Sequence, residues 1–131
     1  MAIGDVTGCR VLVVEDETLI AMEIESVLEA LDCKVVGPTG KLDTALKLAS
    51  EEAFDIAILD VTVRGGKIYP VAEQLIARGI PFALASGYGD WALPEMLRDQ
   101  PRLMKPFTVA ELEGQIRELC GKAAAGKQAA G

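Results

Sequence analysis

Short apolar runs alternate along the chain with longer segments in which apolar residues recur every three or four positions. The runs predict five strands, at residues 10–14, 34–36, 56–59, 82–85 and 102–104. The third run, Ile-Ala-Ile-Leu, does not alternate between apolar and polar residues, as expected for a parallel strand covered on both faces. We expect the second strand to end at Gly37-Pro38.

Each strand is followed by a pattern typical of a helix. Helices are predicted over residues 18–31, 43–50, 70–78, 94–98 and 108–121. Thr18, Asp43 and Thr108 are the expected N-caps, and Glu111 completes a capping box with Thr108. Gly121 is expected to end the last helix.

Five strands alternating with five helices predict an α/β domain in which a five-stranded parallel sheet carries helices on both faces. A chain of 131 residues fits one such domain. We expect a lead-in at residues 1–8, the domain at residues 9–121 and a disordered, low-complexity tail at residues 122–131.

The charge balance narrows the set of partners. Thirteen Lys and Arg residues against 20 Asp and Glu residues give a formal net charge of −7, which repels nucleic acids and anionic lipid surfaces. No apolar run reaches the ~20 residues of a membrane span, and the start of the chain lacks the layout of a signal peptide. We therefore expect a cytoplasmic protein that binds neither nucleic acid nor membranes.

Two residue types exclude further kinds of chemistry. The chain has no histidine, so it cannot form a Ser-His-Asp triad, a histidine zinc site or a phosphohistidine of its own. Its cysteines, Cys9, Cys33 and Cys120, are odd in number and far apart. We expect all three to be reduced and mostly buried.

Polar residues stand where the predicted strands end. Glu15 and Asp16 follow the first strand, Asp60 the third, Ser86 the fourth and Lys105 the fifth. The carboxyl ends of parallel strands form one edge, where ligands bind. Two carboxylates ~4 Å apart repel by about 4 kcal/mol at an effective dielectric of 20, so three together indicate a cation site. Oxygen ligands alone favour Mg²⁺ over zinc.

These residues also suit phosphoryl transfer. A carboxylate beside Mg²⁺ can attack phosphorus and form an aspartyl phosphate. Lys105 would neutralise one phosphoryl oxygen, and the Ser86 hydroxyl would donate a hydrogen bond to another.

The segments VLVVEDE, AILDV, ALASGYG and MKPF resemble the receiver domain of two-component response regulators, over residues 8–120. The resemblance implies a flavodoxin-like (βα)₅ receiver fold. It implies that Asp60 is the phosphoacceptor, and that Glu15, Asp16, Asp60 and the backbone carbonyl of Thr62 bind Mg²⁺.

In the same comparison, Ser86 takes the place of the family's hydroxyl residue, and Lys105 that of its invariant lysine. The bond between Lys105 and Pro106 is then expected to be cis. Arg102 stands where typical receivers carry the aromatic residue that moves on phosphorylation. We therefore expect the loop after the fourth strand to carry that movement, with Tyr88 as the available aromatic residue and Trp91 as a reporter of the loop.

The stretches PFALASGYG and DVTVRGGKIYPVA resemble one subgroup more closely, the single-domain "FATGUY" receivers of bacteria. This implies a partner histidine kinase of the HWE or a related type. We expect a stand-alone response regulator, not a turnover enzyme, that accepts a phosphoryl group from such a kinase or from a phosphotransferase. Its output would pass through contacts with a downstream regulator, and the first helix with Pro106-Phe107 is the expected docking surface.

Two alternative functions remain open. Asp60-Val61-Thr62-Val63 distantly resembles the Asp-x-Asp loop of small Mg²⁺-dependent phosphatases of the haloacid-dehalogenase kind, although Thr62 stands where the second aspartate belongs. The chain could also be a module that docks on a kinase without being phosphorylated.

Overall fold

The computed structural model describes residues 6–87 and 93–130. Its elements are, in chain order, β1 (Arg10–Val14), α1 (Thr18–Ala30), β2 (Lys34–Thr39), α2 (Leu42–Glu51), β3 (Ile56–Asp60), β4 (Thr62–Val63), β5 (Gly66–Lys67), α3 (Tyr69–Arg78), β6 (Phe82–Ser86), the 3₁₀ helix η1 (Glu95–Leu97), β7 (Arg102–Met104) and α4 (Val109–Ala130). Five strands form a parallel sheet in the order β2-β1-β3-β6-β7. This confirms the predicted fold class.

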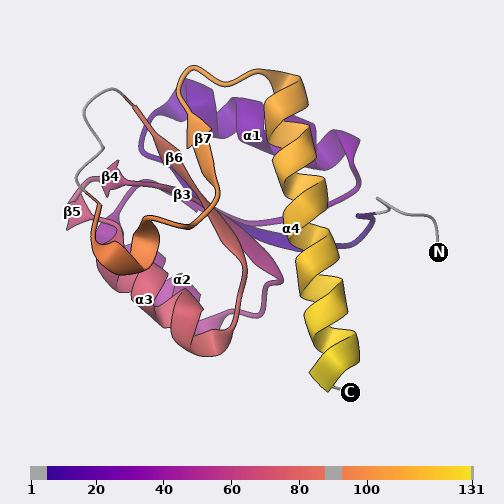
Figure 1. Cartoon of the computed structure of the whole chain (residues 1–131). Coiled ribbons are helices and arrows are strands. Elements are labelled where there is room, and N and C mark those ends of the chain that lie inside the picture. Colours follow the sequence, from indigo (N-terminus) through magenta and orange to yellow (C-terminus); the bar gives the residue numbers. More distant parts are fainter. Residues whose placement is uncertain (1–5, 88–92, 131) are drawn as a thin grey trace.

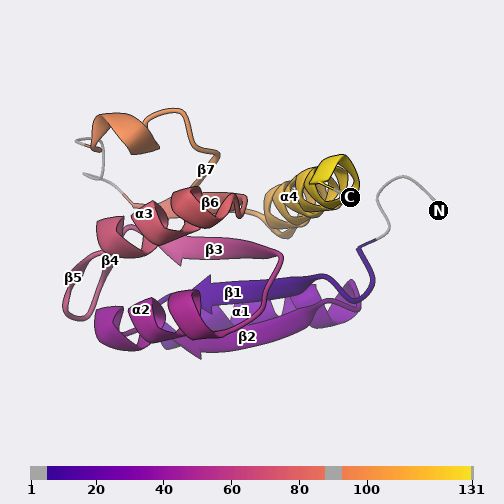
Figure 2. The same ribbon diagram turned by 90° about the horizontal axis from the view of Figure 1, so that it is seen from below.

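The sheet lies between two layers of helices (Figures 1 and 2). Successive side chains of a strand point to opposite faces. Val11 and Val13 of β1 pack in a cluster with residues of α1 and α4, whereas Leu12 and Val14 pack with residues of α2 and α3. Both sets are fully or almost fully buried, which explains why the strand sequences are continuously apolar.

The N-caps follow the prediction at only one helix. The backbone N–H of Glu111 donates to Thr108 Oγ1 at 3.0 Å, and the N–H of Thr108 donates to Glu111 Oε1 at 3.0 Å, which confirms the capping box of α4. Thr18 and Asp43 are not N-caps. Glu17 is the N-cap of α1, so Thr18 is the first residue of that helix, and Lys41 is the N-cap of α2, so Asp43 is its second residue. The Asp43 carboxylate instead accepts a hydrogen bond from the neighbouring N–H of Thr44.

The predicted end of the second strand is wrong. β2 continues through a cis peptide bond between Gly37 and Pro38 and ends at Thr39. The pairing of β2 with β1 is regular up to Leu12 and Val36 and resumes in a shifted register at Val14 and Thr39. Gly37 and Pro38 lie in this irregularity of the ladder. An edge strand tolerates a proline at such a place, because one side of its backbone has no partner strand.

The last helix does not end at Gly121. α4 runs from Val109 to Ala130, because the residues after Gly121 are mostly alanine, lysine and glutamine, which favour helix. The fourth predicted helix is shorter than expected, with only η1 at Glu95–Leu97. The division of the chain at residues 8 and 121 stays a prediction.

The cysteines differ from the expectation as well. Cys9, just before β1, and Cys120, in α4, form a disulfide with their Cα atoms 6.5 Å apart, a spacing that a disulfide can bridge. The wide spacing of the two cysteines in the sequence gave no indication that the residue before β1 meets α4. Cys33 is free and buried, as predicted.

Within residues 6–87 and 93–130, no helix is both long and apolar enough to cross a membrane.

Replacing Gly121 tests whether α4 continues in solution. A Cβ at Gly121 would meet no atom within 4 Å, and alanine is the better helix former. Gly121→Ala is therefore expected to raise the free energy of unfolding by up to about 1 kcal/mol, measured by urea denaturation.

Gly79 provides the matched control, because it caps α3 with φ +69° and its Cβ would also meet nothing. Gly79→Ala is expected to destabilise the protein, since alanine is strained in that conformation. A comparable loss of stability in Gly121→Ala would mean that the helix ends at Gly121 after all.

Candidate functional site

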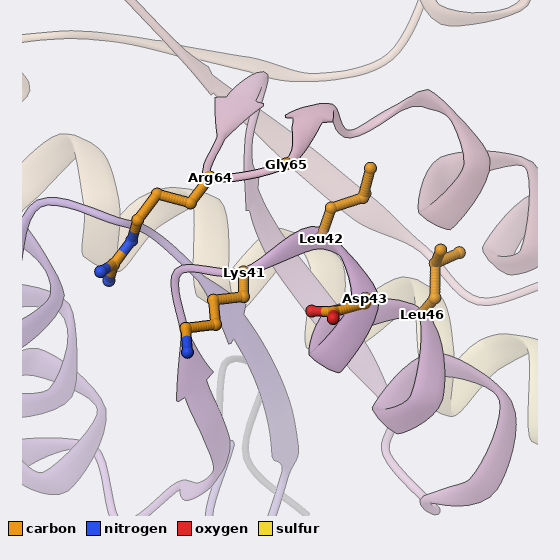
Figure 3. Close-up of a pocket in the computed structure, with 6 residues that line it drawn as sticks. All are labelled: Lys41, Leu42, Asp43, Leu46, Arg64 and Gly65. Atoms are coloured by element: carbon orange, nitrogen blue, oxygen red, sulfur yellow. The ribbon is translucent and has the colours of Figure 1, made fainter.

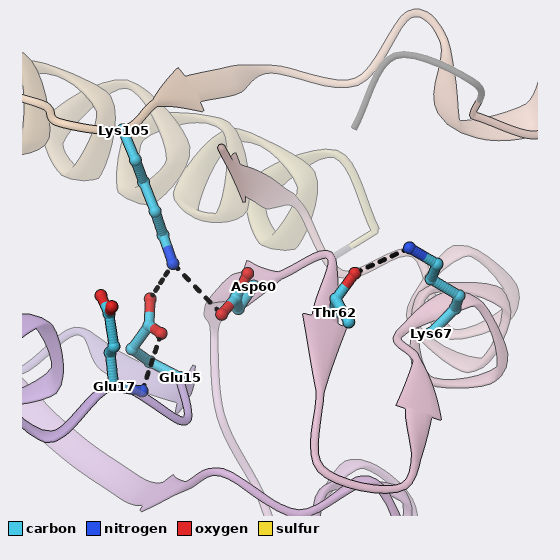
Figure 4. Close-up of polar contacts among 6 residues, drawn as sticks. All are labelled: Glu15, Glu17, Asp60, Thr62, Lys67 and Lys105. Carbon is cyan, nitrogen blue, oxygen red and sulfur yellow. Dashed lines mark hydrogen bonds and ion pairs between the residues drawn. The ribbon is translucent and has the colours of Figure 1, made fainter. Parts of the chain in front are cut away.

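The predicted site residues stand at one edge of the sheet, where the strands end. Glu15 follows β1, Asp60 and Ser86 are the last residues of β3 and β6, and Lys105 follows β7. Because these strands are parallel and adjacent, their carboxyl ends meet there. The structure brings Glu15, Asp60 and Lys105 into contact (Figure 4).

Lys105 joins two buried carboxylates. Its Nζ lies 2.8 Å from Glu15 Oε1 and 3.1 Å from Asp60 Oδ2, and the two acids are only 4% and 6% exposed. Burial would lower the pKa of Lys105, but its hydrogen bond to Glu15 and the charge of Asp60 raise the pKa on balance. The ammonium group therefore stays charged and offsets part of the cost of burying the two acids.

Burial and the neighbouring Glu15 together outweigh the effect of Lys105 on the pKa of Asp60. Burial, followed by a hydrogen bond with Glu15 and the charge of Glu15, raises the pKa of Asp60 from 3.8 to about 8, although Lys105 acts in the opposite direction. A further cation beside Asp60 would favour its ionised form.

Asp16 adds a third carboxylate. One oxygen from each of Glu15, Asp16 and Asp60 lies within 4.8 Å of the other two. Asp16 is only half-buried, so the cluster is open to solvent on its side. A set of oxygen ligands with one open side fits Mg²⁺, which keeps part of its water shell.

The end of β2 determines the position of Asp16. The backbone N–H of Glu15 donates to the carbonyl of Thr39 at 2.9 Å. A Cβ on the next residue, Gly40, would lie 2.7 Å from Asp16 Cα and 3.0 Å from a guanidinium nitrogen of Arg64. Only glycine fits between Asp16 and Arg64 at this position. The need for a glycine here could not be predicted from the sequence pattern.

Thr62 belongs to a small hairpin that the sequence pattern did not predict. β4 and β5 pair antiparallel. Gly65, in the turn between them, has φ +104°, and Gly66, the first residue of β5, has φ +137°. Lys67 Nζ donates to Thr62 Oγ1 at 2.8 Å (Figure 4). Pairing with Lys67 fixes the backbone of Thr62, which lies two residues after Asp60 in the sequence. The role of the Thr62 carbonyl stays a prediction.

Ser86 lies at the same edge but makes a different contact. Its side chain is buried, and the hydroxyl donates to Met104 Sδ at 3.5 Å. The backbone N–H of Lys105 donates to the Ser86 carbonyl at 2.9 Å. No pattern in the sequence marks Met104 as a neighbour of Ser86, because their proximity follows from the register of β6 and β7. Tyr88 and Trp91 lie outside the described residues.

Two cavities border the acidic cluster and the hairpin. One of about 190 Å³ includes Glu15, Asp16 and Gly40 in its lining. Another, of about 400 Å³, lies between α2 and the β4–β5 hairpin (Figure 3). It is lined by Lys41, Leu42, Asp43, Leu46, Arg64 and Gly65. Arg64 borders both cavities.

The chain is similar to SdrG from Sphingomonas melonis Fr1. The two are 42% identical, the match covers 89% of this chain and 97% of SdrG, and the TM-score is 0.74. A solution structure of the BeF₃-activated conformation of SdrG is 44% identical over 84% of this chain, with a TM-score of 0.68.

Two further proteins are similar to this chain. The phyllosphere-induced regulator PhyR of Methylorubrum extorquens is 30% identical over 114 residues, and this chain spans only 42% of its length. The receiver domain of the sensor histidine kinase PA1611 of Pseudomonas aeruginosa PAO1, solved with a magnesium ion in its active-site cleft, shares the fold. Its TM-score is 0.76 at 22% identity, over 88% of this chain and 99% of that domain. No protein-family model matches the chain.

The raised pKa of Asp60 predicts a pH dependence of stability in the metal-free protein. A carboxyl group with a higher pKa in the folded state binds its proton more tightly there, so stability falls as pH rises from 3.8 to about 8. Asp60→Asn removes this ionisation. In thermal unfolding with a chelator present, the Tm of Asp60→Asn should therefore exceed that of the wild type by an amount that grows from about pH 4 to about pH 8.

The control is Asp99→Asn, which changes an exposed aspartate that follows η1 in the sequence. It should follow the wild-type curve. Parallel curves for Asp60→Asn and the wild type would contradict the assignment of the shifted group.

Proposed function

The chain belongs to the family of response-regulator receiver domains, and from this we propose that Asp60 accepts a phosphoryl group from the phosphohistidine of a partner. The observation that carries the proposal is the ion pair of Lys105 with both Glu15 and Asp60, with Asp16 beside them. A buried acid at a strand end, held by a lysine and neighbouring two further acids, is equipped to attack phosphorus.

Glu15, Asp16 and Asp60, together with the carbonyl of Thr62, would hold Mg²⁺. One oxygen of each of the three carboxylates lies within 4.8 Å of the other two, and burial disfavours the ionised form of Asp60. When bound, Mg²⁺ would neutralise charge on the phosphoryl oxygens. The magnesium in the PA1611 receiver domain supports the choice of ion.

The phosphohistidine of the proposed donor would belong to another protein, because this chain has no histidine. An Asp60 carboxylate oxygen forms the bond to phosphorus, and the phosphorus–nitrogen bond to the donor imidazole breaks with its electron pair going to nitrogen. Lys105 then pairs with a phosphoryl oxygen, and the Ser86 hydroxyl donates a hydrogen bond to another. The partner is a histidine kinase, of the HWE type by the subgroup resemblance, or a phosphotransferase.

Contacts with that kinase and with a downstream regulator would use α1. Leu19 and Met22 on this helix are 81% and 57% exposed, and α1 begins next to the acidic cluster. Large apolar side chains exposed beside a reactive site favour a protein–protein contact. Pro106 and Phe107, after Lys105, lie on the same edge of the sheet and would extend this surface.

The protein would act as a signalling domain in the cytoplasm rather than as a turnover enzyme. Phosphatases of the haloacid-dehalogenase kind need a second acid two residues after the nucleophile. Thr62 stands at that position, and its hydroxyl accepts a hydrogen bond from Lys67. Hence the structure offers no general acid there, and the phosphatase alternative is not favoured.

Asp60→Asn tests the phosphoacceptor. The variant is expected to lose phosphorylation by acetyl phosphate, because an amide does not attack phosphorus, and intact-mass spectrometry measures the product. Asp99→Asn, an exposed control, should be phosphorylated like the wild type. Phosphorylation of Asp60→Asn at the wild-type level would overturn the proposal.

Asp16→Ala tests the metal site. Loss of one ligand charge should weaken Mg²⁺ binding at least about tenfold by calorimetric titration, while relief of repulsion should leave the metal-free Tm equal to or above that of the wild type. Glu17→Ala is the matched control, because Glu17 is an adjacent, exposed acid outside the cluster. Equal Mg²⁺ affinities in the two variants would contradict the assignment.

A further inference from the structure

The hydroxyl of Ser86 already has a partner in the structure. It is buried, 1% exposed, and donates to the thioether sulfur of Met104 at 3.5 Å. The register of the sheet pairs Ser86 of β6 with Met104 of β7, and the bond from the Lys105 N–H to the Ser86 carbonyl fixes the two strands at this point. The contact therefore follows from the backbone pairing of β6 with the edge strand β7.

A serine hydroxyl has one proton to donate. It can donate this proton to the sulfur of Met104 or to a phosphoryl oxygen, but not to both. If Asp60 is the phosphoacceptor, as proposed above, Ser86 must leave Met104 when the phosphoryl group arrives.

We propose that Met104 is a positioning residue that holds the Ser86 hydroxyl in the unphosphorylated state. The inference rests on the proposed function. Arg102, two residues earlier on β7, pairs in register with Leu84 rather than with Ser86. Met104, not Arg102, is thus the residue of β7 whose side chain contacts the hydroxyl that has to move.

The hydrogen bond places a cost on phosphorylation, because it is lost in the phosphorylated state. Removing the Met104 sulfur leaves the buried Ser86 hydroxyl without its acceptor. This destabilises only the unphosphorylated state, because the hydroxyl has left Met104 in the phosphorylated state. The phosphorylated state then becomes more favourable relative to the unphosphorylated state. Met104 is 48% exposed, so its replacement by leucine changes the packing of the core little.

Beryllofluoride with Mg²⁺ is the probe, because it imitates the aspartyl phosphate without a covalent step. Its affinity is measured by calorimetry for the wild type, Met104→Leu, Ser86→Ala and the double variant. Met104→Leu should bind about threefold to tenfold more tightly, as expected for the loss of one hydrogen bond. In the Ser86→Ala background, the same change should have no effect.

The double-variant comparison separates positioning from structure. A purely structural effect of Met104→Leu would appear in both backgrounds, whereas an effect through the Ser86 hydroxyl disappears with it. Met96→Leu, a change at another partly exposed methionine, should leave the affinity unchanged. Met104→Ile, which also lacks the sulfur, replaces Met104→Leu if that variant does not fold.

Unchanged or weaker binding by Met104→Leu, or an equal gain in the Ser86→Ala background, would overturn the inference alone. No binding of beryllofluoride by the wild type would instead overturn the proposed function, and the role of Met104 with it.

Discussion

The contact of the Lys105 ammonium with the buried carboxylates of Glu15 and Asp60 is the interaction on which the site depends. Two acids in a nearly closed environment repel each other and lose their hydration, and a single lysine offsets only part of that cost. Its reach from the end of β7 to the ends of β1 and β3 requires all three strands in the same sheet. The site and the sheet are therefore specified by the same register.

The continuous apolar core makes this register unambiguous. Each strand of the sheet centre is buried on both faces, between α1 and α4 on one side and α2 and α3 on the other. A shift of one strand by a residue would exchange the side chains of both layers at once. The polar groups at the strand ends are thus held in place by the packing of the core, although their mutual repulsion and their burial lower the stability of the fold.

How much the sequence predicted follows from which interactions are local. The strands and the gathering of Glu15, Asp60 and Lys105 were predictable, because apolar runs mark parallel strands and their ends share one edge. The end of β2 and the disulfide of Cys9 were not, since both depend on which elements become neighbours. The contact between Ser86 and Met104 depends on the pairing of β6 with β7, which no pattern within either strand reveals.

The close approach at Gly40 connects the reactive edge to the margin of the sheet. Asp16 rests against Gly40, and Glu15 is bonded to Thr39 at the end of β2, the edge strand. Edge strands exchange their amide hydrogens through local opening more readily than central ones. Fraying of β2 would free Asp16 while β1, β3 and β6 stay folded. If Asp16 holds a divalent ion as proposed, local opening of β2 would weaken that site while the centre of the sheet stays folded.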